Sequence, residues 1–256
     1  MDEKLRERYS RNLALHEVGE TGQEKLLQSH VLVVGAGGLG SPVLLYLTFM
    51  GIGHIGIVDG DVVGLSNLNR QVLYSEADLG KPKAVQAAHR LQQQSSQTTF
   101  TVYPEFLTAE NVKTILPGYD VVVDCLDNFS ARFLLNDACL DFQIPFVYGG
   151  VYKYEGQLLT VIPGETPCLR CLFPNGEEGA PDQKTITEDG ILGTTPGVLG
   201  VLQANAVFKL LLNLPQQIGN LFYFDTISLT AENMPLVVNP ACRCQKKKES
   251  HGIRPL

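Results

Sequence analysis

A glycine-rich stretch, "VVGAGGLGS", is the first part of this 256-residue chain whose spacing could do chemistry. Gly35, Gly37 and Gly40 follow the pattern G-x-G-x-x-G, Gly38 adds a further glycine, and Asp59 lies nineteen residues beyond the last of them. This spacing is typical of a loop that binds phosphates and of an acid that binds a ribose. Phosphates also suit a helix amino terminus, whose backbone N–H groups are unpaired. The stretch predicts a nucleotide site and leaves NAD and ATP both open.

Two short polar segments that follow favour ATP over NAD. "SNLNRQ" (66–71) supplies Asn67 and Arg70, and "GKPK" (80–83) supplies Lys83. A guanidinium and an ammonium in one crevice neutralise a triphosphate better than they serve hydride transfer. The alternative interpretation is an ordinary surface loop with solvated salt bridges.

An acid stands at the end of a later apolar run, "YDVVVDCLDN" (119–128). A carboxylate that faces phosphates is repulsive unless a divalent cation lies between them, so Asp127 is a candidate Mg²⁺ ligand. Asn128 is a candidate hydrogen bonder at the strand end. The alternative role for Asp127 is to cap the next helix.

The six cysteines fall into two kinds. Cys125 and Cys139 have apolar surroundings and are interpreted as buried small hydrophobes. The other four form two close pairs in the C-terminal half: Cys168 with Cys171, and Cys242 with Cys244. Four thiolates on two short clips are typical of a closed, structural zinc site, and two unrelated pairs of thiols are the alternative.

The elements that must position these residues alternate between strand and helix. Short β-branched runs stopped by polar residues are typical of buried parallel strands. We expect strands over 30–38, 54–61, 98–106 and 119–128, with helices over 39–53, 82–94 and 108–118. The carboxyl ends of such strands share one edge of the sheet, so the glycine loop (residues 35–40), Asp59 and Asp127 should converge there.

The C-terminal half changes in character from about residue 149. "GGVYKYEGQLLTVIPG" alternates like antiparallel strands, with a turn expected at Gly156. Residues 174–195 should form a mobile crossover, 195–214 a buried helix, 221–230 a late strand and 246–256 a solvated tail. The predicted fold class is α/β: a Rossmann-like, mostly parallel sheet flanked by helices, continuing into a smaller antiparallel β half with a zinc site.

Composition narrows the function classes. The net charge of −7 argues against a general nucleic-acid binder. We expect no membrane span, because no apolar run approaches the roughly 20 residues that one needs, and the amino terminus lacks the apolar core of a secretory signal. A cytoplasmic address follows, where a reducing environment favours free thiols or metal ligands over disulfides.

Taken together, these residues resemble the ThiF/MoeB/HesA family, the bacterial relatives of ubiquitin-activating E1 enzymes. The resemblance runs from about residue 7 to residue 244 and is carried by nine stretches: "RYSRN", "GQEKLL", "VLVVGAGGLGSP", "GIVDGDVVGLSNLNRQ", "GKPKA", "DCLDNFSARFLLNDAC", "YGGVYKYEGQ", "PCLRCLFP" and "GVLGVLQANAVFKLLL". It implies an enzyme that binds Mg·ATP. The C-terminal glycine carboxylate of a small ubiquitin-like sulfur carrier ending in Gly-Gly would attack the α-phosphate, giving an acyl-adenylate and pyrophosphate.

The resemblance also implies roles for individual residues. The glycine loop and Asp59 would contact phosphates and ribose. Arg70 and Lys83 would stabilise negative charge, and Asp127 would have a role in binding magnesium. Arg11 matches the arginine that the partner subunit of the family inserts into the ATP site, which implies a homodimer. The chain would be one adenylating domain, with a nucleotide-binding half (1–148), a carrier-binding and zinc half (149–245) and a tail (246–256).

One departure from the family pattern bears on the chemistry. Many members have a cysteine near the position of Thr185, Ile186 and Thr187, and in some it links covalently to the carrier, whereas this chain has none there. We therefore expect adenylation without a covalent carrier intermediate, and a separate sulfur donor. A ThiS-like carrier is favoured and a MoaD-like carrier is the alternative. An NAD-dependent oxidoreductase and an inactive dimeric scaffold are the alternatives from other classes.

Overall fold

The computed structural model describes residues 1–176, 189–216 and 218–245. Most of the predicted crossover, including Thr185, Ile186 and Thr187, lies outside the described residues, as does the predicted tail.

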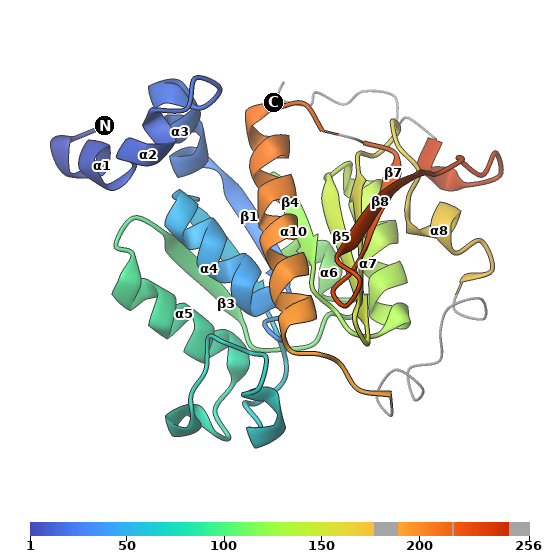
Figure 1. Ribbon diagram of the computed structural model, residues 1–256, viewed down its shortest axis with the longest axis horizontal. Coiled ribbons are helices and arrows are strands. Elements are labelled where there is room, and N and C mark those ends of the chain that lie inside the picture. Colours follow the sequence, from blue (N-terminus) through green and yellow to red (C-terminus); the bar gives the residue numbers. More distant parts are fainter. Residues whose placement is uncertain (177–188, 217, 246–256) are drawn as a thin grey trace.

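A single eight-stranded sheet organises the described residues, in the order β3-β2-β1-β4-β5-β6-β7-β8 (Figure 1). The first five strands in this order are parallel, and β5 to β8 pair antiparallel. The strands are β1 (His30–Val34), β2 (His54–Val58), β3 (Thr99–Tyr103), β4 (Val121–Asp124), β5 (Phe146–Tyr152), β6 (Glu155–Val161), β7 (Asn220–Asp225) and β8 (Thr230–Pro235). The predicted α/β class with a Rossmann-like parallel part and an antiparallel end is confirmed. The boundary at 148/149 falls inside β5, so the two predicted halves share one sheet.

Helices cover both faces of this sheet. On one face α10 packs beside α4, with α5 next to them (Figure 1). On the other face lie α6 and α7. The helices are α1 (Glu3–Arg8), α2 (Ser10–Leu13), α3 (Gly19–Gln28), α4 (Gly40–Met50), α5 (Lys83–Gln94), α6 (Val112–Ile115), α7 (Phe129–Phe142), α8 (Leu169–Leu172) and α10 (Thr194–Leu212), with short 3₁₀ turns η1 (Leu65–Asn67), η2 (Glu76–Asp78) and η4 (Arg243–Gln245).

Strand β1 explains why the parallel strands are recognisable in the sequence. Val31 and Val33 belong to the core beneath α4, α5 and α10, whereas Leu32 and Val34 belong to the core beneath α6 and α7. Successive side chains of a strand point to opposite faces, so a strand covered on both faces is apolar at every position.

Two expectations for the antiparallel strands differ from the structure. Gly156 lies within β6 and not at a turn. A glycine is needed there because the ring of Phe224 on β7 occupies the space that a Cβ would need. The turn between β5 and β6 falls at Lys153, whose φ is +50°. The late strand expected over 221–230 is β7, which ends at Asp225, and the rest of that range is the turn and the first residue of β8. All six residues of β8 are exposed, so no apolar alternation marks this strand.

The helix expected over 108–118 is only the four-residue α6. The preceding residues form a reciprocal cap instead. The Thr108 N–H donates to Asn111 Oδ1 at 2.7 Å, and the Asn111 N–H donates to Thr108 Oγ1 at 3.2 Å. Asn111 thus occupies the third position of a capping box, where an acid or glutamine is usual.

Helix α10 is long and apolar enough to cross a membrane by composition alone. It packs against α4 and against strands β4, β5 and β6, and half of its most apolar 18-residue stretch is buried inside the protein. A core helix has this character, so α10 is weak evidence for a membrane span.

Candidate functional site

Two glycines of the glycine loop are required by the fold itself. Gly35 follows β1 with a φ of +100°, and an added Cβ would overlap the carbonyl group of Cys125. At Gly40 an added Cβ would overlap the carbonyl group of Gly35. These residues allow the chain to turn tightly from β1 into α4 while touching the end of β4.

The other two glycines are not required by packing. A Cβ on Gly37 would meet only the side chain of Gln71, at 3.4 Å, and a Cβ on Gly38 would meet Pro196 and Arg70 at 3.4 and 3.5 Å. These are ordinary contact distances, and neither residue has a positive φ. The absence of side chains here leaves backbone accessible beside a helix amino terminus, as a bound phosphate chain requires.

Asp59, directly after β2, is fixed against the glycine loop. Its Oδ2 accepts a hydrogen bond from the Ala36 N–H at 2.7 Å, and its Oδ1 accepts from the Asp61 N–H at 2.8 Å. Burial raises the pKa of Asp59, and the two backbone donors and Lys83 offset part of that rise. Each oxygen keeps a lone pair for a ribose hydroxyl.

Lys83 is the first residue of α5 and pairs with Asp61 and not with Asp59. Its Nζ lies 3.0 Å from Asp61 Oδ2, and its N–H donates to the Asp61 carbonyl oxygen at 2.9 Å. The Lys83 side chain is 7% exposed and that of Asp61 54%. The lysine side chain is therefore buried, while its partner carboxylate faces solvent.

Residues 66–71 lie across the glycine loop. Arg70 Nη1 donates to the carbonyl oxygen of Ser66 and to Asn69 Oδ1, both at 3.0 Å, and the Arg70 side chain lies next to Gly38. Asn67 shapes the segment, because its Oδ1 accepts from the Gly64 N–H at 3.1 Å. Asn67 is therefore occupied in part by the turn that carries Arg70.

Gln71 is a site residue that the sequence interpretation missed. Its side chain is buried against Gly37, and its Oε1 is one of the buried oxygens with no partner in the described part of the chain. A buried acceptor without a donor is costly, so a ligand or water that donates to this oxygen would complete it. The Gln71 atom nearest to Gly37 is Nε2. The place of Gln71 within "NRQ", one residue after Arg70, was the available signal.

Asn128, and not Asp127, takes the capping role that the sequence left open for Asp127. Asn128 caps α7, because its Oδ1 accepts from the Ala131 N–H at 2.8 Å. Asp127 is exposed, two residues after Cys125, which touches Gly35. The structure therefore leaves the Asp127 carboxylate free of the capping role, at the edge where the glycine loop lies.

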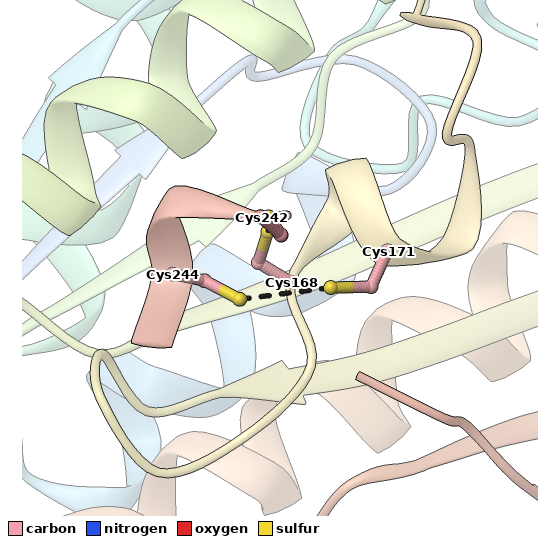
Figure 2. Close-up of side chains that lie close together, drawn as sticks. All are labelled: Cys168, Cys171, Cys242 and Cys244. Carbon is pink, nitrogen blue, oxygen red and sulfur yellow. Dashed lines mark hydrogen bonds between the residues drawn. The ribbon is translucent and has the colours of Figure 1, made fainter. Parts of the chain in front are cut away.

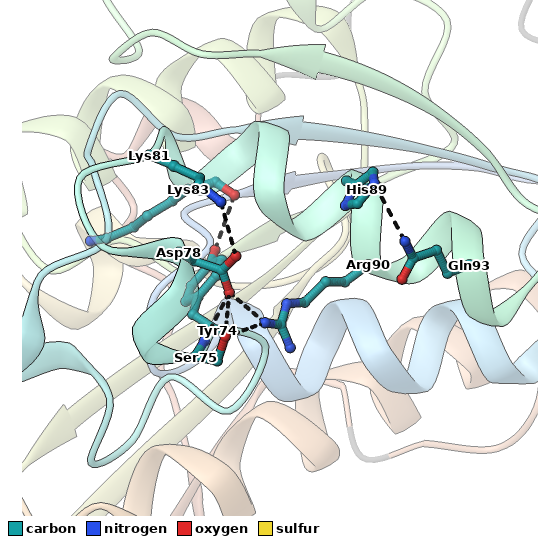
Figure 3. Close-up of polar contacts among 8 residues, drawn as sticks. All are labelled: Tyr74, Ser75, Asp78, Lys81, Lys83, His89, Arg90 and Gln93. Atoms are coloured by element: carbon teal, nitrogen blue, oxygen red, sulfur yellow. Dashed lines mark hydrogen bonds and ion pairs between the residues drawn. The ribbon is translucent and has the colours of Figure 1, made fainter.

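A second set of contacts braces the segment that leads to Lys83 (Figure 3). Asp78 accepts hydrogen bonds from the N–H and the hydroxyl of Ser75 at 2.9 and 3.0 Å and pairs with Arg90 on α5. Burial opposes ionisation of Asp78, but these donors outweigh it and hold its pKa below the usual range. The hydroxyl of Tyr74 lies 2.8 Å from the Ala36 carbonyl oxygen and 3.3 Å from that of Lys83.

Arg11 does not lie with the other predicted site residues. It is exposed on α2, where the next residue, Asn12, donates to Gln23, and Gln23 donates to the carbonyl oxygen of Met50. Met50 ends α4, whereas Gly40 begins it. At 1.5 Å per residue, the two ends of α4 are about 15 Å apart. Within one chain, Arg11 is therefore at the opposite end of α4 from the glycine loop.

The four predicted zinc ligands are gathered from two segments far apart in sequence (Figure 2). Their sulfur atoms all lie within 4.8 Å of one another. Cys168 Sγ is 3.5 Å from Cys242 Sγ, and Cys171 Sγ is 3.6 Å from Cys244 Sγ. Tetrahedral zinc–thiolate bonds of about 2.3 Å place sulfurs about 3.8 Å apart, so the cluster fits zinc.

Arginines beside these cysteines anchor both segments to α7. Arg170 forms a two-pronged pair with Asp137, at 2.8 Å from Nε and 2.7 Å from Nη2. Arg243 pairs with Asp141 at 2.6 Å and donates to the Asp137 carbonyl oxygen at 3.0 Å. The cysteine cluster is thus tied to the helix that Asn128 begins.

Together these contacts gather the glycine loop, Asp59, Arg70 and Lys83 at the carboxyl edge of the parallel strands, with Asp127 at the adjoining strand end. Open backbone at a helix amino terminus, with an arginine and a lysine nearby, can hold a polyphosphate and stabilise negative charge that develops on it.

Comparison with known proteins gives concordant matches. The model of the ThiF family matches residues 9–246. The "SAMP-activating enzyme E1" of Haloferax volcanii is 42% identical over 246 residues, covering 94% of this chain and 89% of that protein. The "Sulfur carrier protein adenylyltransferase" of Thermus thermophilus is 42% identical over 243 residues, covering 92% and 89%.

Two further matches differ in length or in identity. "Adenylyltransferase and sulfurtransferase MOCS3" of Culex quinquefasciatus is 44% identical over 90% of this chain, which spans 52% of that protein. The crystal structure of E. coli MccB with ATP superposes with a TM-score of 0.80 at 25% identity, covering 93% of this chain and 74% of that one.

Proposed function

Because this chain belongs to the ThiF family, we propose that it is an adenylyltransferase acting on the C-terminal carboxylate of a small ubiquitin-like sulfur carrier. The observation that carries the proposal is the cradle at Gly37 and Gly38, which packing leaves open beside Arg70 and a buried Lys83. The names of the Thermus thermophilus and Haloferax volcanii relatives agree with it.

In the proposed reaction, a carboxylate oxygen of the carrier's terminal glycine attacks the α-phosphorus of ATP. The bond from that phosphorus to the oxygen bridging to the β-phosphate breaks, so pyrophosphate leaves and a mixed anhydride remains. A carboxylate is ionised at neutral pH, so no general base is needed. Arg70 and Lys83 would offset the charge that builds up on the phosphates, and the crevice would hold the two anions together.

We propose a metal-binding role for Asp127 because Asn128, and not Asp127, caps α7. Mg²⁺ prefers oxygen ligands and commonly takes one or two protein carboxylates together with substrate phosphates. Asp127 offers one exposed carboxylate at the carboxyl end of β4, near the glycine loop. Magnesium would supply charge neutralisation between Asp127 and the phosphates. The cysteine cluster, with four thiols and no open position, would hold zinc in a structural role.

We also propose a homodimer with composite sites, because Arg11 cannot reach the glycine loop of its own chain. Helix α4 presents Tyr46 and Phe49, which are 47% and 42% exposed and offer apolar surface to a second copy. A subunit-mixing experiment tests this. Arg11→Ala and Asp127→Ala should each be inactive, and a mixture should regain activity because a mixed dimer has one intact site. No recovery after subunit exchange would contradict composite sites.

The cysteines support a reaction without a covalent carrier intermediate. Residues 172–241 contain no cysteine. Cys125 and Cys139 are buried, and burial raises the pKa of both thiols well above the usual value, so neither is a ready nucleophile. The remaining four lie in the cluster. Sulfur would therefore come from a separate donor, and a thioester or acyl-persulfide adduct seen by mass spectrometry would contradict this proposal.

A ThiS-like carrier is our first choice and a MoaD-like carrier the second. The site residues argue for a nucleotide and do not distinguish these two carriers. ATP–pyrophosphate exchange with each carrier tests both the chemistry and the choice. We expect exchange that depends on one carrier and on its terminal Gly-Gly. Exchange with neither carrier, together with thermal protection by NADH and not by Mg·ATP, would favour an oxidoreductase.

A further inference from the structure

Leu126, the residue directly before Asp127, has both of its backbone polar groups held by charged side chains. Its N–H donates to Asp124 Oδ1 at 3.0 Å, and its carbonyl oxygen accepts a hydrogen bond from Arg132 Nη2. The residue directly after Asp127 is Asn128, the cap of α7. Asp127 is therefore an exposed carboxylate between two residues with fixed backbones.

The two residues that hold Leu126 are deeply buried, with Asp124 1% exposed and Arg132 5% exposed. The guanidinium of Arg132 lies over the rings of Phe129 and Tyr148, with 5.6 and 4.9 Å to the ring centroids. With its guanidinium packed on these rings, Arg132 donates from Nη2 to the loop that follows β4.

Asp124 and Arg132 do not form a close ion pair. Arg132 Nη1 is 4.0 Å from Asp124 Oδ2, and both atoms are buried without a hydrogen-bond partner in the described part of the chain. A buried ion pair gains stability only with close geometry and fully satisfied atoms, and apolar residues often serve as well. The hydrogen bonds that Asp124 and Arg132 make are instead those to Leu126.

We propose that Asp124 and Arg132 are positioning residues, whose buried pair holds the backbone of Leu126 so that Asp127 presents its carboxylate to the metal of bound Mg·ATP. The inference rests on the proposed function. It assigns the pair no contact with the nucleotide; the pair acts only through Asp127.

The test uses two variants and one matched control. Arg132→Lys keeps the charge but lacks the planar fork, so it cannot hold Leu126 from the same position. Asp124→Asn removes the charge opposite Arg132, so the buried guanidinium is no longer held in place to donate to the Leu126 carbonyl oxygen, and this variant is used if the lysine variant does not fold. The control is Asp120→Asn, at the other end of β4, where a carboxylate accepts the His30 N–H at 2.8 Å.

The readout is the Mg²⁺ concentration that gives half-maximal binding of ATP, measured by calorimetry without carrier. Loss of groups that orient a metal ligand commonly costs about 10- to 100-fold, so we expect the Mg²⁺ requirement of both variants to rise about tenfold or more. Asp120→Asn should stay within about twofold. A folded Asp124→Asn or Arg132→Lys protein with an unchanged Mg²⁺ requirement would overturn the inference.

A double-mutant cycle with Asp127→Ala tests whether the pair acts through Asp127. Once Asp127 is removed, Asp124→Asn should have no further effect on the Mg²⁺ requirement, and additive losses would overturn the inference. Because these measurements need no carrier, they are separable from the proposed function. Wild-type protein that binds Mg·ATP but gives no exchange with any carrier would contradict the proposed function alone.

Discussion

The hydroxyl of Tyr74 lies 2.8 Å from the carbonyl oxygen of Ala36 and donates a hydrogen bond to it, which joins the segment after Arg70 to the glycine loop. Burial raises the pKa of this hydroxyl, and Asp59 and Asp78 raise it further, so it stays protonated and keeps its donor. The same hydroxyl approaches the Lys83 carbonyl oxygen at 3.3 Å. One buried side chain thus connects the glycine loop to the start of α5.

Tyr74→Phe should therefore loosen the glycine loop without removing the ring from the core. Loss of one buried hydrogen bond costs about 1 kcal/mol, which corresponds to about a fivefold rise in the KM for ATP if the loop must be re-ordered on binding. Steady-state pyrophosphate exchange measures this KM. The control, Tyr119→Phe, removes a hydroxyl that contacts Tyr103, and its KM should not change. Equal KM values for both variants would contradict the link.

The glycine loop contains a matched pair of substitutions that separate fold from ligand binding. Gly40→Ala should destabilise the protein by about 2–3 kcal/mol, because its Cβ would overlap the Gly35 carbonyl group. Gly37→Ala should change the free energy of unfolding by less than about 0.5 kcal/mol and yet weaken ATP binding, because it fills only the cradle. Urea unfolding and calorimetry measure the two effects. Normal ATP binding by Gly37→Ala would argue against the cradle.

The pH dependence of stability should include a contribution from Asp78. Its pKa is lower in the folded protein than in the unfolded chain, so its contribution is complete above the unfolded pKa of about 3.9 and is lost as the pH falls through the lower folded value. Asp78→Asn should cost about 2 kcal/mol near neutral pH, and the difference from wild type should shrink below about pH 4.

Urea unfolding across the acid range measures this difference. Glu76→Gln, an exposed charge change two residues away, is the control and should show no such loss. A difference between Asp78→Asn and wild type that stays constant down to about pH 2 would show that the ion pair with Arg90 is not the cause.

The cysteine cluster should bind about one zinc ion per chain. Cys171→Ser removes one proposed ligand and should lower both the zinc content and the Tm, because a bound metal would join α8 to the segment after β8. Cys139→Ala, at a buried cysteine outside the cluster, should keep its zinc. Metal analysis of the purified proteins measures the content. Wild-type protein with no zinc, and a Tm that a chelator leaves unchanged, would contradict the assignment.

Local patterns in the sequence predicted the parts of the fold that depend on local causes. β1 is apolar at successive positions because it is buried on both faces, and its end is marked by glycines. β8 has no such signal, since it is an edge strand whose residues are all exposed and whose backbone pairs with β7. The Cys-x-x-Cys and Cys-x-Cys spacings likewise marked the two halves of the cluster.

The supporting residues of the site could not be predicted in this way. Arg132 looks like any arginine of an amphipathic helix, and only the approach of α7 to the end of β4 brings it to Leu126. Tyr74 gives no local signal either, because Ala36 is 38 residues away in the chain. Roles that depend on contacts between distant segments need the tertiary structure.

The most direct test of the central claim is mass spectrometry of the carrier after one turnover with wild-type protein and Mg·ATP. We predict a carrier that gains one adenylyl group at its C-terminal carboxylate, with release of pyrophosphate, and none with Asp127→Ala or with a carrier whose terminal carboxylate is amidated. An amidated carrier that is modified equally well, or a wild-type reaction that leaves the carrier unmodified, would contradict the account.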